Sequence, residues 1–187
     1  MEWVIAAVIV VVVAILGIYV WASYNSLVAL NRRVDEAWRD IAVQVKRRSD
    51  LLPGIVDTVQ GYASHERAAF DSVARARAET IAASDATAAS AAENRMQTAI
   101  KGLFRVAEGY PQLQSSQEFL RLQSDLAATE EKIQASRRFY NGGVRELNSK
   151  VTSFPNSMYS RRAGIGQRGF FEVSSLAAIS EPPRVQF

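Results

Sequence analysis

The sequence contains no cysteine, only one histidine and five prolines among its 187 residues. Without cysteine the chain can form neither a disulfide nor a thiolate-ligated metal site. The formal net charge of +3 is too small to predict a nucleic-acid-binding protein. Strand patterns are also missing, because apolar residues recur almost everywhere with a helical period. The composition therefore predicts an all-α protein with no metal, no cofactor and no nucleic-acid partner.

Charge is likewise absent from residues 3–21, which read WVIAAVIVVVVAILGIYVW. A helix of that length, rising about 1.5 Å per residue, covers about 27 Å and matches the ~30 Å hydrocarbon core of a bilayer. Trp3 lies at one end of the run, and Tyr19, Trp21 and Tyr24 lie at the other, as in the aromatic belts of membrane–water interfaces. The sequence therefore predicts a transmembrane anchor over residues 1–23.

Two other interpretations of this apolar run compete with an anchor. A cleaved signal peptide would have a basic start, a shorter apolar centre and small residues before the cleavage site. Here the chain starts with Met1 and Glu2, and the sequence at residues 20–22 is a poor cleavage site. A buried helix of a soluble protein is the second alternative, but such helices seldom lack polar residues over this length. An uncleaved anchor fits the sequence best.

Basic residues follow the apolar run closely, and none precedes it. Arg32 and Arg33 come first, and we assign both to the membrane interface together with the four aromatic residues. The next basic residues along the chain are Arg39, Lys46, Arg47 and Arg48. Because cytoplasmic flanks carry the excess of Lys and Arg, this asymmetry predicts a single-pass protein with a cytoplasmic body.

Four amphipathic helices are predicted after the anchor. The first continues it without a break, with the apolar spacing of a buried stripe at Leu27, Leu30, Val34, Ala37 or Trp38, Ile41 and Val45. Pro53 is expected to end this helix near Ser49 or Asp50, because proline lacks an N–H and disfavours a helical residue before it. The second helix is expected to run from about Pro53 into the alanine-rich eighties.

Capping patterns predict where the last two helices begin. Ser90 with Glu93, and Ser115 with Glu118, have the spacing of a capping box. The third helix is expected to end near residue 109 and the fourth near residue 154, where Gly and Pro recur. Packed together, the helices would form an elongated antiparallel four-helix bundle over residues 24–155. Residues 156–187 are predicted to be an irregular tail that drapes over the bundle, orders only in an assembly, or stays disordered.

Several short motifs together resemble the LemA family of bacterial membrane-anchored helical proteins. They are YNSLV at 24–28, VDEAW at 34–38, VQVKRRSDLLP at 43–53, GYASHE at 61–66, AEGYP at 107–111, RRFYN at 137–141 and FPN at 154–156. The resemblance implies a helical bundle on one N-terminal span in the inner membrane of a bacterial cell, with no established catalytic residues to carry over. The sequence departs from the family's usual pattern at Gly54, where asparagine is more common, and most of all in the tail.

Candidate chemistry is sparse. His65, followed by Glu66, has the local look of a phosphoaccepting histidine, but no Gly-rich phosphate-binding loop accompanies it. A histidine that forms hydrogen bonds on a polar face or between helices is the simpler interpretation. The Glu-x-x-His spacing of four-helix di-iron sites is absent. We therefore predict no catalytic residues, no cofactor-binding residues and no metal ligands.

Polar residues at positions that should pack tightly are of more interest. The candidates for buried hydrogen bonds that fix helix register, or for subunit contacts, are Asn25, Trp38, Arg137, Arg138 and Asn141. The acidic residues expected to be solvated or paired with arginines are Glu108, Glu130 and Glu131.

These patterns favour a noncatalytic, membrane-anchored helical protein that assembles with copies of itself as a scaffold or membrane-organising component. Parallel anchors in one membrane raise the local concentration of the helical bodies, so weak lateral contacts become appreciable. The alternative is a signalling or regulatory adaptor that binds a membrane protease or sensor. An enzymatic role ranks third, and His65 is its best candidate residue. The predicted partners are the lipid bilayer, further copies of the chain and another membrane protein.

Overall fold

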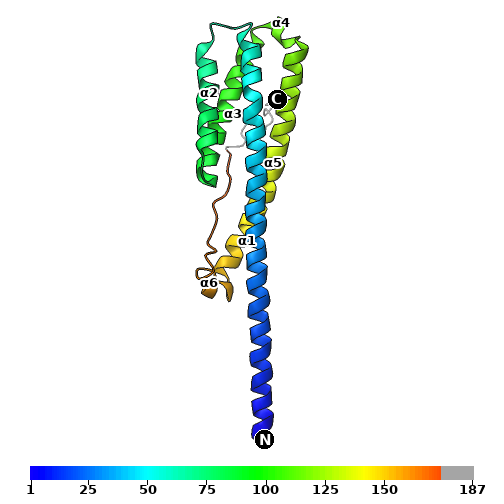
Figure 1. The fold of residues 1–187 in the computed structure, drawn as a ribbon, viewed down its shortest axis with the longest axis vertical. Coiled ribbons are helices and arrows are strands. Elements are labelled where there is room, and N and C mark those ends of the chain that lie inside the picture. Colours follow the sequence, from blue (N-terminus) through cyan, green and yellow to red (C-terminus); the bar gives the residue numbers. More distant parts are fainter. Residues whose placement is uncertain (174–187) are drawn as a thin grey trace, which may run out of the picture. The chain divides into compact units, whose positions relative to one another are not determined.

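The computed structural model describes residues 1–173, and these are helical apart from turns and one irregular segment. Its six helices are α1 (Glu2–Gln60), α2 (Arg67–Ala82), α3 (Ala86–Glu108), α4 (Pro111–Gln114), α5 (Gln117–Thr152) and α6 (Asn156–Tyr159) (Figure 1). No strand occurs within residues 1–173. The predicted all-α class, with a long apolar N-terminal helix, is confirmed.

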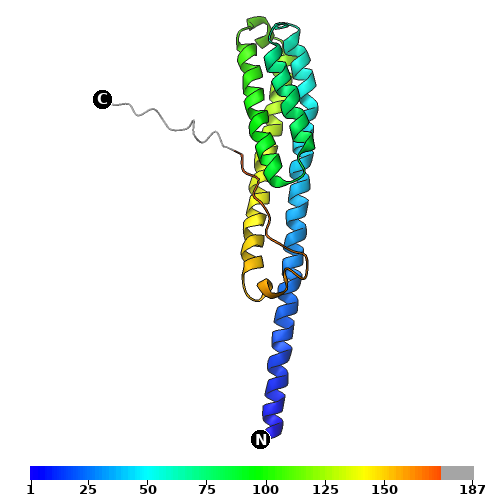
Figure 2. The same ribbon diagram turned by 90° about the vertical axis from the view of Figure 1, so that its left-hand side faces the viewer.

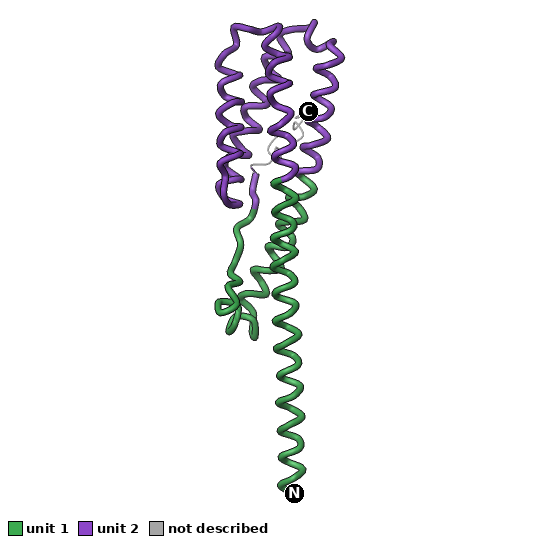
Figure 3. Tube along the Cα trace, viewed as in Figure 1, with its two compact units in different colours: residues 1–42, 134–170 green, residues 43–133, 171–187 purple. Residues whose placement is uncertain are grey.

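The chain divides into two compact units, coloured separately in Figure 3. Unit 1 consists of residues 1–42 and 134–170. Unit 2 consists of residues 43–133 and, within the described chain, residues 171–173. Helices α1 and α5 each contribute residues to both units.

The apolar start of α1 packs against nothing in the described chain. Residues 1–22 are all exposed, and Trp3 and Trp21 are 88% and 68% accessible. This is the only helix in residues 1–173 that is long and apolar enough to cross a membrane, and none of its most apolar 18-residue window is buried. The alternative of a core helix in a soluble protein is therefore wrong, since such a helix would be covered.

Burial in unit 1 begins at Leu27, where the predicted stripe of α1 packs on α5. Five stripe residues are buried: Leu27, Leu30, Val34, Ala37 and Ile41. On α5, Tyr140, Val144 and Leu147 are buried as well. A Cβ added to Gly143 would lie 3.1 Å from Val34 Cγ2, so this glycine lets the two helices approach closely. Helix α5 continues through its glycine pair because packing of this kind outweighs low helix propensity.

Unit 2 contains one hydrophobic core, to which five helices contribute side chains; Figure 2 shows these helices as ribbons. The buried side chains come from α1 (Leu52, Ile55 and Val59), α2 (Val73 and Ala76), α3 (Met96, Ala99, Leu103 and Ala107), α4 (Leu113) and α5 (Phe119 and Leu126). On α1, α2 and α3 these residues recur at the three- and four-residue spacing of an amphipathic stripe. The predicted packing of amphipathic helices is thus present, whereas the four-helix bundle over residues 24–155 stays a prediction.

Pro53 does not end the first helix, so that prediction was wrong. Proline at this position leaves the Ser49 carbonyl without its helical N–H partner. Arg77 on α2 replaces that partner, because its Nε donates to the Ser49 carbonyl oxygen at 2.9 Å. Leu52 and Ile55 on either side are each 1% exposed, and their burial holds the helix through the proline.

The second helix does not start at Pro53 either, since α1 extends to Gln60 and α2 begins only at Arg67. Helix α1 is interrupted at Gly61, because glycine has a low helix propensity. The backbone N–H groups of Gly61 and Ala63 bond back to the carbonyls of Asp57 and Val59, which closes the helix in a turn.

Neither predicted capping box forms, so both predictions were wrong. Asp85, not Ser90, caps α3: its carboxylate accepts from the backbone N–H groups of Thr87 and Ala88 at 2.9 and 2.8 Å. Ser90 lies inside α3 and donates to the Ala86 carbonyl oxygen. At the start of α5, the hydroxyl that accepts a backbone N–H belongs to Ser116, not to Ser115. The predicted ends of the third and fourth helices agree with Glu108 and Thr152 to within two residues.

The described part of the tail is irregular after α6, as predicted, yet it is pinned to the helices. In unit 1, Tyr140 Oη donates to the Gly169 carbonyl oxygen at 2.9 Å, and the backbone N–H of Arg168 donates to Asn148 Oδ1 at 2.8 Å. In unit 2, the backbone N–H of Glu172 donates to Ser90 Oγ, and Phe171 is 1% exposed. The predicted draping is therefore observed up to residue 173, and the rest of the tail prediction lies outside the described residues.

Candidate functional site

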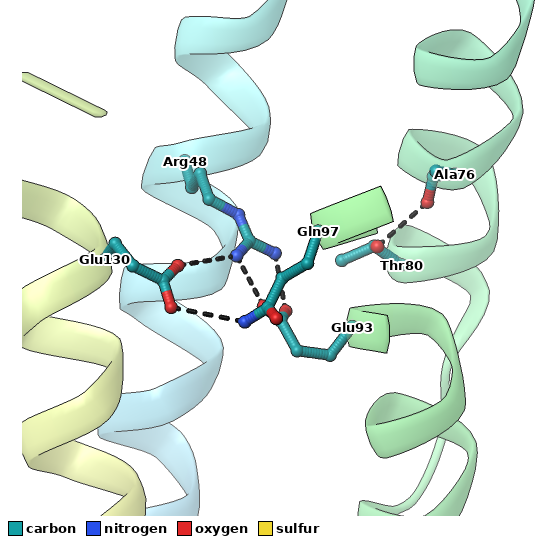
Figure 4. Close-up of polar contacts among 6 residues, drawn as sticks. All are labelled: Arg48, Ala76, Thr80, Glu93, Gln97 and Glu130. Carbon is teal, nitrogen blue, oxygen red and sulfur yellow. Dashed lines mark hydrogen bonds and ion pairs between the residues drawn. The ribbon is translucent and has the colours of Figure 1, made fainter. Parts of the chain in front are cut away.

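The most unusual group of residues in unit 2 is a buried charge cluster made by Arg48, Glu93, Gln97 and Glu130 (Figure 4). The Arg48 guanidinium donates through both terminal nitrogens to the two carboxylate oxygens of Glu93, each at 2.5 Å. Its Nη1 also donates to Glu130 Oε2 at 3.1 Å. The side chains of Arg48 and Glu93 are 0% and 1% exposed, whereas that of Glu130 is 34% exposed.

The amphipathic stripes of three helices place these charges in the interior. Arg48 lies one turn before Leu52 on α1, and Glu93 lies one turn before Met96 on α3. Glu130 lies one turn after Leu126 on α5. Gln97, one turn after Glu93, donates from Nε2 to Glu130 Oε1 at 3.3 Å and links the two carboxylates. The cluster therefore joins α1, α3 and α5 at one level.

The pKa of Arg48 reflects two opposing effects. Burial of the guanidinium lowers its pKa, but the hydrogen bonds and negative charges of Glu93 and Glu130 outweigh the burial and raise the pKa above its ordinary value. Arg48 thus remains protonated. Two glutamate side chains face this one cation.

This arrangement can position helices. A permanently protonated arginine cannot act as a base, and no histidine, cysteine, serine or lysine belongs to the four residues. Among residues 1–173, no group of three or more His, Cys, Asp or Glu side chains is placed to hold a metal ion. The cluster fixes how the helices align, because both hydrogen bonds of a bidentate Arg–Glu pair form in only one register of the two helices.

An open groove of about 270 Å³ lies beside the cluster, between α3 and α5. Arg48 and Glu130 contribute to its lining, together with apolar and long polar side chains. The remaining residues of the lining are Gln97, Ile100, Lys101, Phe104, Gln123, Leu126 and Ala127.

Comparison with known proteins identifies the group to which this chain is related. The sequence profile of the LemA family matches residues 37–187. The chain belongs to the LemA family. It is also similar to the protein LemA of Metamycoplasma hominis, with 24% identity over 157 residues that cover 83% of this chain and 71% of that protein. The family resemblance inferred from the sequence motifs is confirmed, and all four residues of the charge cluster lie within the matched region of this LemA-family chain.

His65 lies in the exposed loop between α1 and α2 of the LemA-family chain, not on a helix face as the predicted helix boundaries required. Glu66 precedes α2 directly and makes no side-chain cap hydrogen bond. The pair is therefore separate from the charge cluster.

The polar residues expected at tight places divide into two groups. Asn25 and Arg138 are exposed, which does not fit buried hydrogen bonds, and their alternative role in subunit contacts stays a prediction. Trp38, Arg137 and Asn141 are half-buried. Trp38 contacts Tyr140 in a tilted arrangement, with ring centroids 5.3 Å apart and ring planes at 49°. The three glutamates were expected to be either solvated or paired with arginines. Glu130 pairs with Arg48, whereas Glu108 and Glu131 are exposed.

The six predicted membrane-interface residues all lie on α1 and are all exposed. Tyr24 is 40% accessible and makes an edge contact with Tyr159, with ring centroids 5.9 Å apart. Arg32 and Arg33 lie beyond it on the same helix and are open to solvent. Their assignment to a lipid interface stays a prediction.

Sequence reasoning missed Arg48 and Glu93 as partners. Arg48 was grouped with the other basic residues near the membrane, and Glu93 was assigned to a helix cap. The sequence did contain a signal for this pair. The basic residue Arg48 and the acidic residue Glu93 each occupy a position in the apolar stripe of their helix. A charge in such a position requires an opposite charge in a facing stripe.

Proposed function

We propose that this LemA-family protein is a noncatalytic, single-span protein of the bacterial inner membrane whose helical body self-assembles as a scaffold. The observation that carries the proposal is the sharp change along α1. Residues 3–21 expose an uncharged, largely apolar surface, and burial begins at Leu27 on the same helix. A bilayer would cover the first part, and α5 covers the second.

Charge supports a cytoplasmic body in this proposal. Glu2 is the only charged side chain before the apolar run, whereas Arg32, Arg33 and Arg39 are exposed after it. The positive-inside rule places such residues in the cytoplasm, where they also face the anionic inner leaflet. Arg48 contributes less to this attraction because Glu93 and Glu130 surround it.

Exposed apolar side chains in unit 2 support self-assembly. Val43, Ile81 and Leu120 are 60%, 67% and 51% accessible. Anchoring in one membrane raises the effective concentration of copies into a range where such small contacts associate. None of the three residues belongs to the charge cluster, so each can be altered without disturbing it.

The absence of cysteine from the chain makes a direct test of self-assembly practicable. Single cysteines are placed at Val43, Ile81 or Leu120 of the full chain and oxidised in native membranes, with Ser84→Cys at another exposed position as the matched control. We expect a disulfide-linked dimer of this chain from at least one of the three apolar positions and a larger species by light scattering in detergent. A monomer at high protein concentration, without any such dimer, would overturn the scaffold.

The groove between α3 and α5 favours the second candidate, an adaptor for a membrane protease or sensor. Its apolar lining beside Lys101 would suit a partner segment with apolar and acidic side chains. A photo-crosslinking residue at Gln123, exposed on α5, separates the two functions in native membranes. Adducts between copies support the scaffold, and one dominant foreign adduct supports the adaptor.

A further inference from the structure

The corner that joins α5 to α6 lies beside the residues of α1 that directly follow the apolar run (Figures 1 and 2). Ser23 Oγ donates to Asn156 Oδ1 at 2.7 Å, and Lys150 Nζ donates to Ser26 Oγ at 2.9 Å. All of these residues belong to unit 1. We call residues 153–162 the corner. The two hydrogen bonds hold the corner beside residues 23–26 of α1.

That level coincides with the expected membrane surface. Trp21 ends the apolar run, and Ser23 follows it by only about 3 Å along the helix axis. Asn156 therefore sits within the headgroup layer when residues 3–21 cross the hydrocarbon core. The ring contact between Tyr24 of α1 and Tyr159 places an aromatic residue of the corner at the same level.

The surface chemistry of the corner suits a lipid interface. Phe154 and Met158 are 78% and 71% accessible, although both are large and apolar. Arg161 and Arg162 are exposed next to them. No Asp or Glu occurs between residues 147 and 171. Apolar side chains flanked by arginines, without acidic residues, are typical of segments that lie in the headgroup region of anionic membranes.

The backbone of the corner is also compatible with that depth. The N–H groups of Ser157, Ser160 and Ala163 bond to carbonyls within the same turn. Irregular backbone is excluded from the hydrocarbon core but is tolerated at the interface, where water and headgroups supply the remaining partners.

We propose that the corner is a second membrane contact, in which Phe154 and Met158 insert at the boundary between headgroups and acyl chains and Arg161 and Arg162 bind anionic lipid headgroups. This inference rests on the proposed function, because it requires residues 3–21 to span the bilayer. It adds a ligand class, anionic phospholipid, and a two-point attachment that would restrict the tilt of unit 1 against the membrane.

The test uses single-cysteine variants of the full chain labelled with an environment-sensitive fluorophore and reconstituted into vesicles. Phe154→Cys and Met158→Cys report on the corner, and their exposure means that neither change disturbs the core. Phe139→Cys is the matched control: it replaces the same residue type, is also exposed at 59%, and lies about 20 Å back along α5. Val12→Cys reports on the anchor.

We expect lipids that carry a spin label in the acyl chain to quench the labels at 154, 158 and 12, and aqueous iodide to quench only the label at 139. A blue shift at 154 should be larger in vesicles of phosphatidylcholine with phosphatidylglycerol than in phosphatidylcholine alone, and Arg161→Gln with Arg162→Gln should reduce the difference. Iodide quenching at 154 and 158 equal to that at 139 would overturn the membrane contact. Protection from both quenchers would overturn it too, since protein would then cover the corner. If the label at 12 escapes lipid quenching, the anchor itself fails, and so does the proposed function.

Discussion

Arg48 shows how a single charge can be tolerated in the core of unit 2. Its guanidinium reaches two carboxylates, and Gln97 links those carboxylates to each other. Of the guanidinium nitrogens of Arg48, Nε alone lacks a hydrogen-bond acceptor within residues 1–173. The cost of burying the charge is therefore largely offset, while removal of one partner would leave the other uncompensated.

We expect Arg48→Met to lower the free energy of unfolding by about 3–5 kcal/mol, because Glu93 would remain buried without its cation. Replacing both residues, as Arg48→Met with Glu93→Leu, should recover most of that loss, since Glu130 is 34% exposed and can be solvated. The neighbouring Arg47→Met, at an exposed position, is the matched control and should change little. Denaturant titration of the full chain in detergent, followed by circular dichroism, measures all three. Equal effects of the Arg48 and Arg47 variants would contradict a structural role for the cluster.

Tyr140 should make unit 1 sensitive to alkaline pH. Burial raises the pKa of its phenol, and Asp35 adds to the rise, whereas Arg168 opposes it. Because the folded state then holds the proton more tightly than the unfolded state, stability is fully present below the ordinary pKa of 10.0 and is lost as the pH rises through the higher pKa of the folded state. We expect Tyr140→Phe to show a smaller decline in unfolding free energy over that range. In an absorbance titration, this variant should also lose the tyrosine ionisation that occurs above the ordinary pKa. An unchanged titration curve would contradict the raised pKa of Tyr140.

At the scale of elements, α1 and α5 are continuous where the sequence suggests interruption. At Pro53 the compensating group comes from another helix, Arg77 of α2, which bonds the Ser49 carbonyl. At the glycine pair of α5, close packing on Val34 is the compensation.

The bond between Arg77 and Ser49 should be coupled energetically to Pro53. Arg77→Met is expected to cost about 1–3 kcal/mol, because the Ser49 carbonyl loses its donor in a site where Ser49 is only 2% exposed. In a Pro53→Ala background the cost should be much smaller, since residue 53 then supplies a backbone N–H to that carbonyl. A double-mutant cycle of unfolding free energies measures the coupling, and additive effects would show that the two residues act independently.

The two glycines of α5 should respond in opposite ways to alanine. A Cβ at Gly142 meets nothing within 4 Å, so Gly142→Ala should raise the unfolding free energy by up to about 1 kcal/mol through helix propensity. Gly143→Ala should lose that gain, because its Cβ would lie 3.1 Å from Val34 Cγ2. The two melting temperatures, measured side by side in the same detergent, test the pair. A similar rise in both would mean that α1 and α5 are less closely packed than described.

Helix type and the apolar stripes could be predicted from the sequence because they depend on local periodicity. Leu27, Leu30 and Val34 are buried as their spacing indicated. The continuation of α1 through Pro53 could not be predicted, because it depends on a tertiary contact in which Arg77 bonds the Ser49 carbonyl. The start of α3 was wrong for a different reason: Asp85 caps the helix locally, ahead of the serine at residue 90. The Arg48–Glu93 pair joins residues 45 positions apart and depends on which helices face each other, which periodicity alone does not encode.

At the scale of the whole molecule, the proposed orientation has a direct readout. We expect Ile81→Cys, 67% exposed in unit 2, to be protected from a membrane-impermeant maleimide in intact spheroplasts and to react after permeabilisation. Glu2→Cys should react without permeabilisation, because the positive-inside rule places the N-terminal stub outside. The reverse pattern of labelling would show that the body faces the other side of the membrane.

The pairing of α1 with α5 in unit 1 also dictates an order of events on the ribosome. Ser23 must wait for Asn156, which is made 133 residues later, before their hydrogen bond can form. The apolar stripe from Leu27 to Ile41 stays uncovered until Tyr140, Val144 and Leu147 have been translated. Unit 1 can therefore pack only after about a hundred further residues have been added, so its folding depends on contacts between distant parts of the chain.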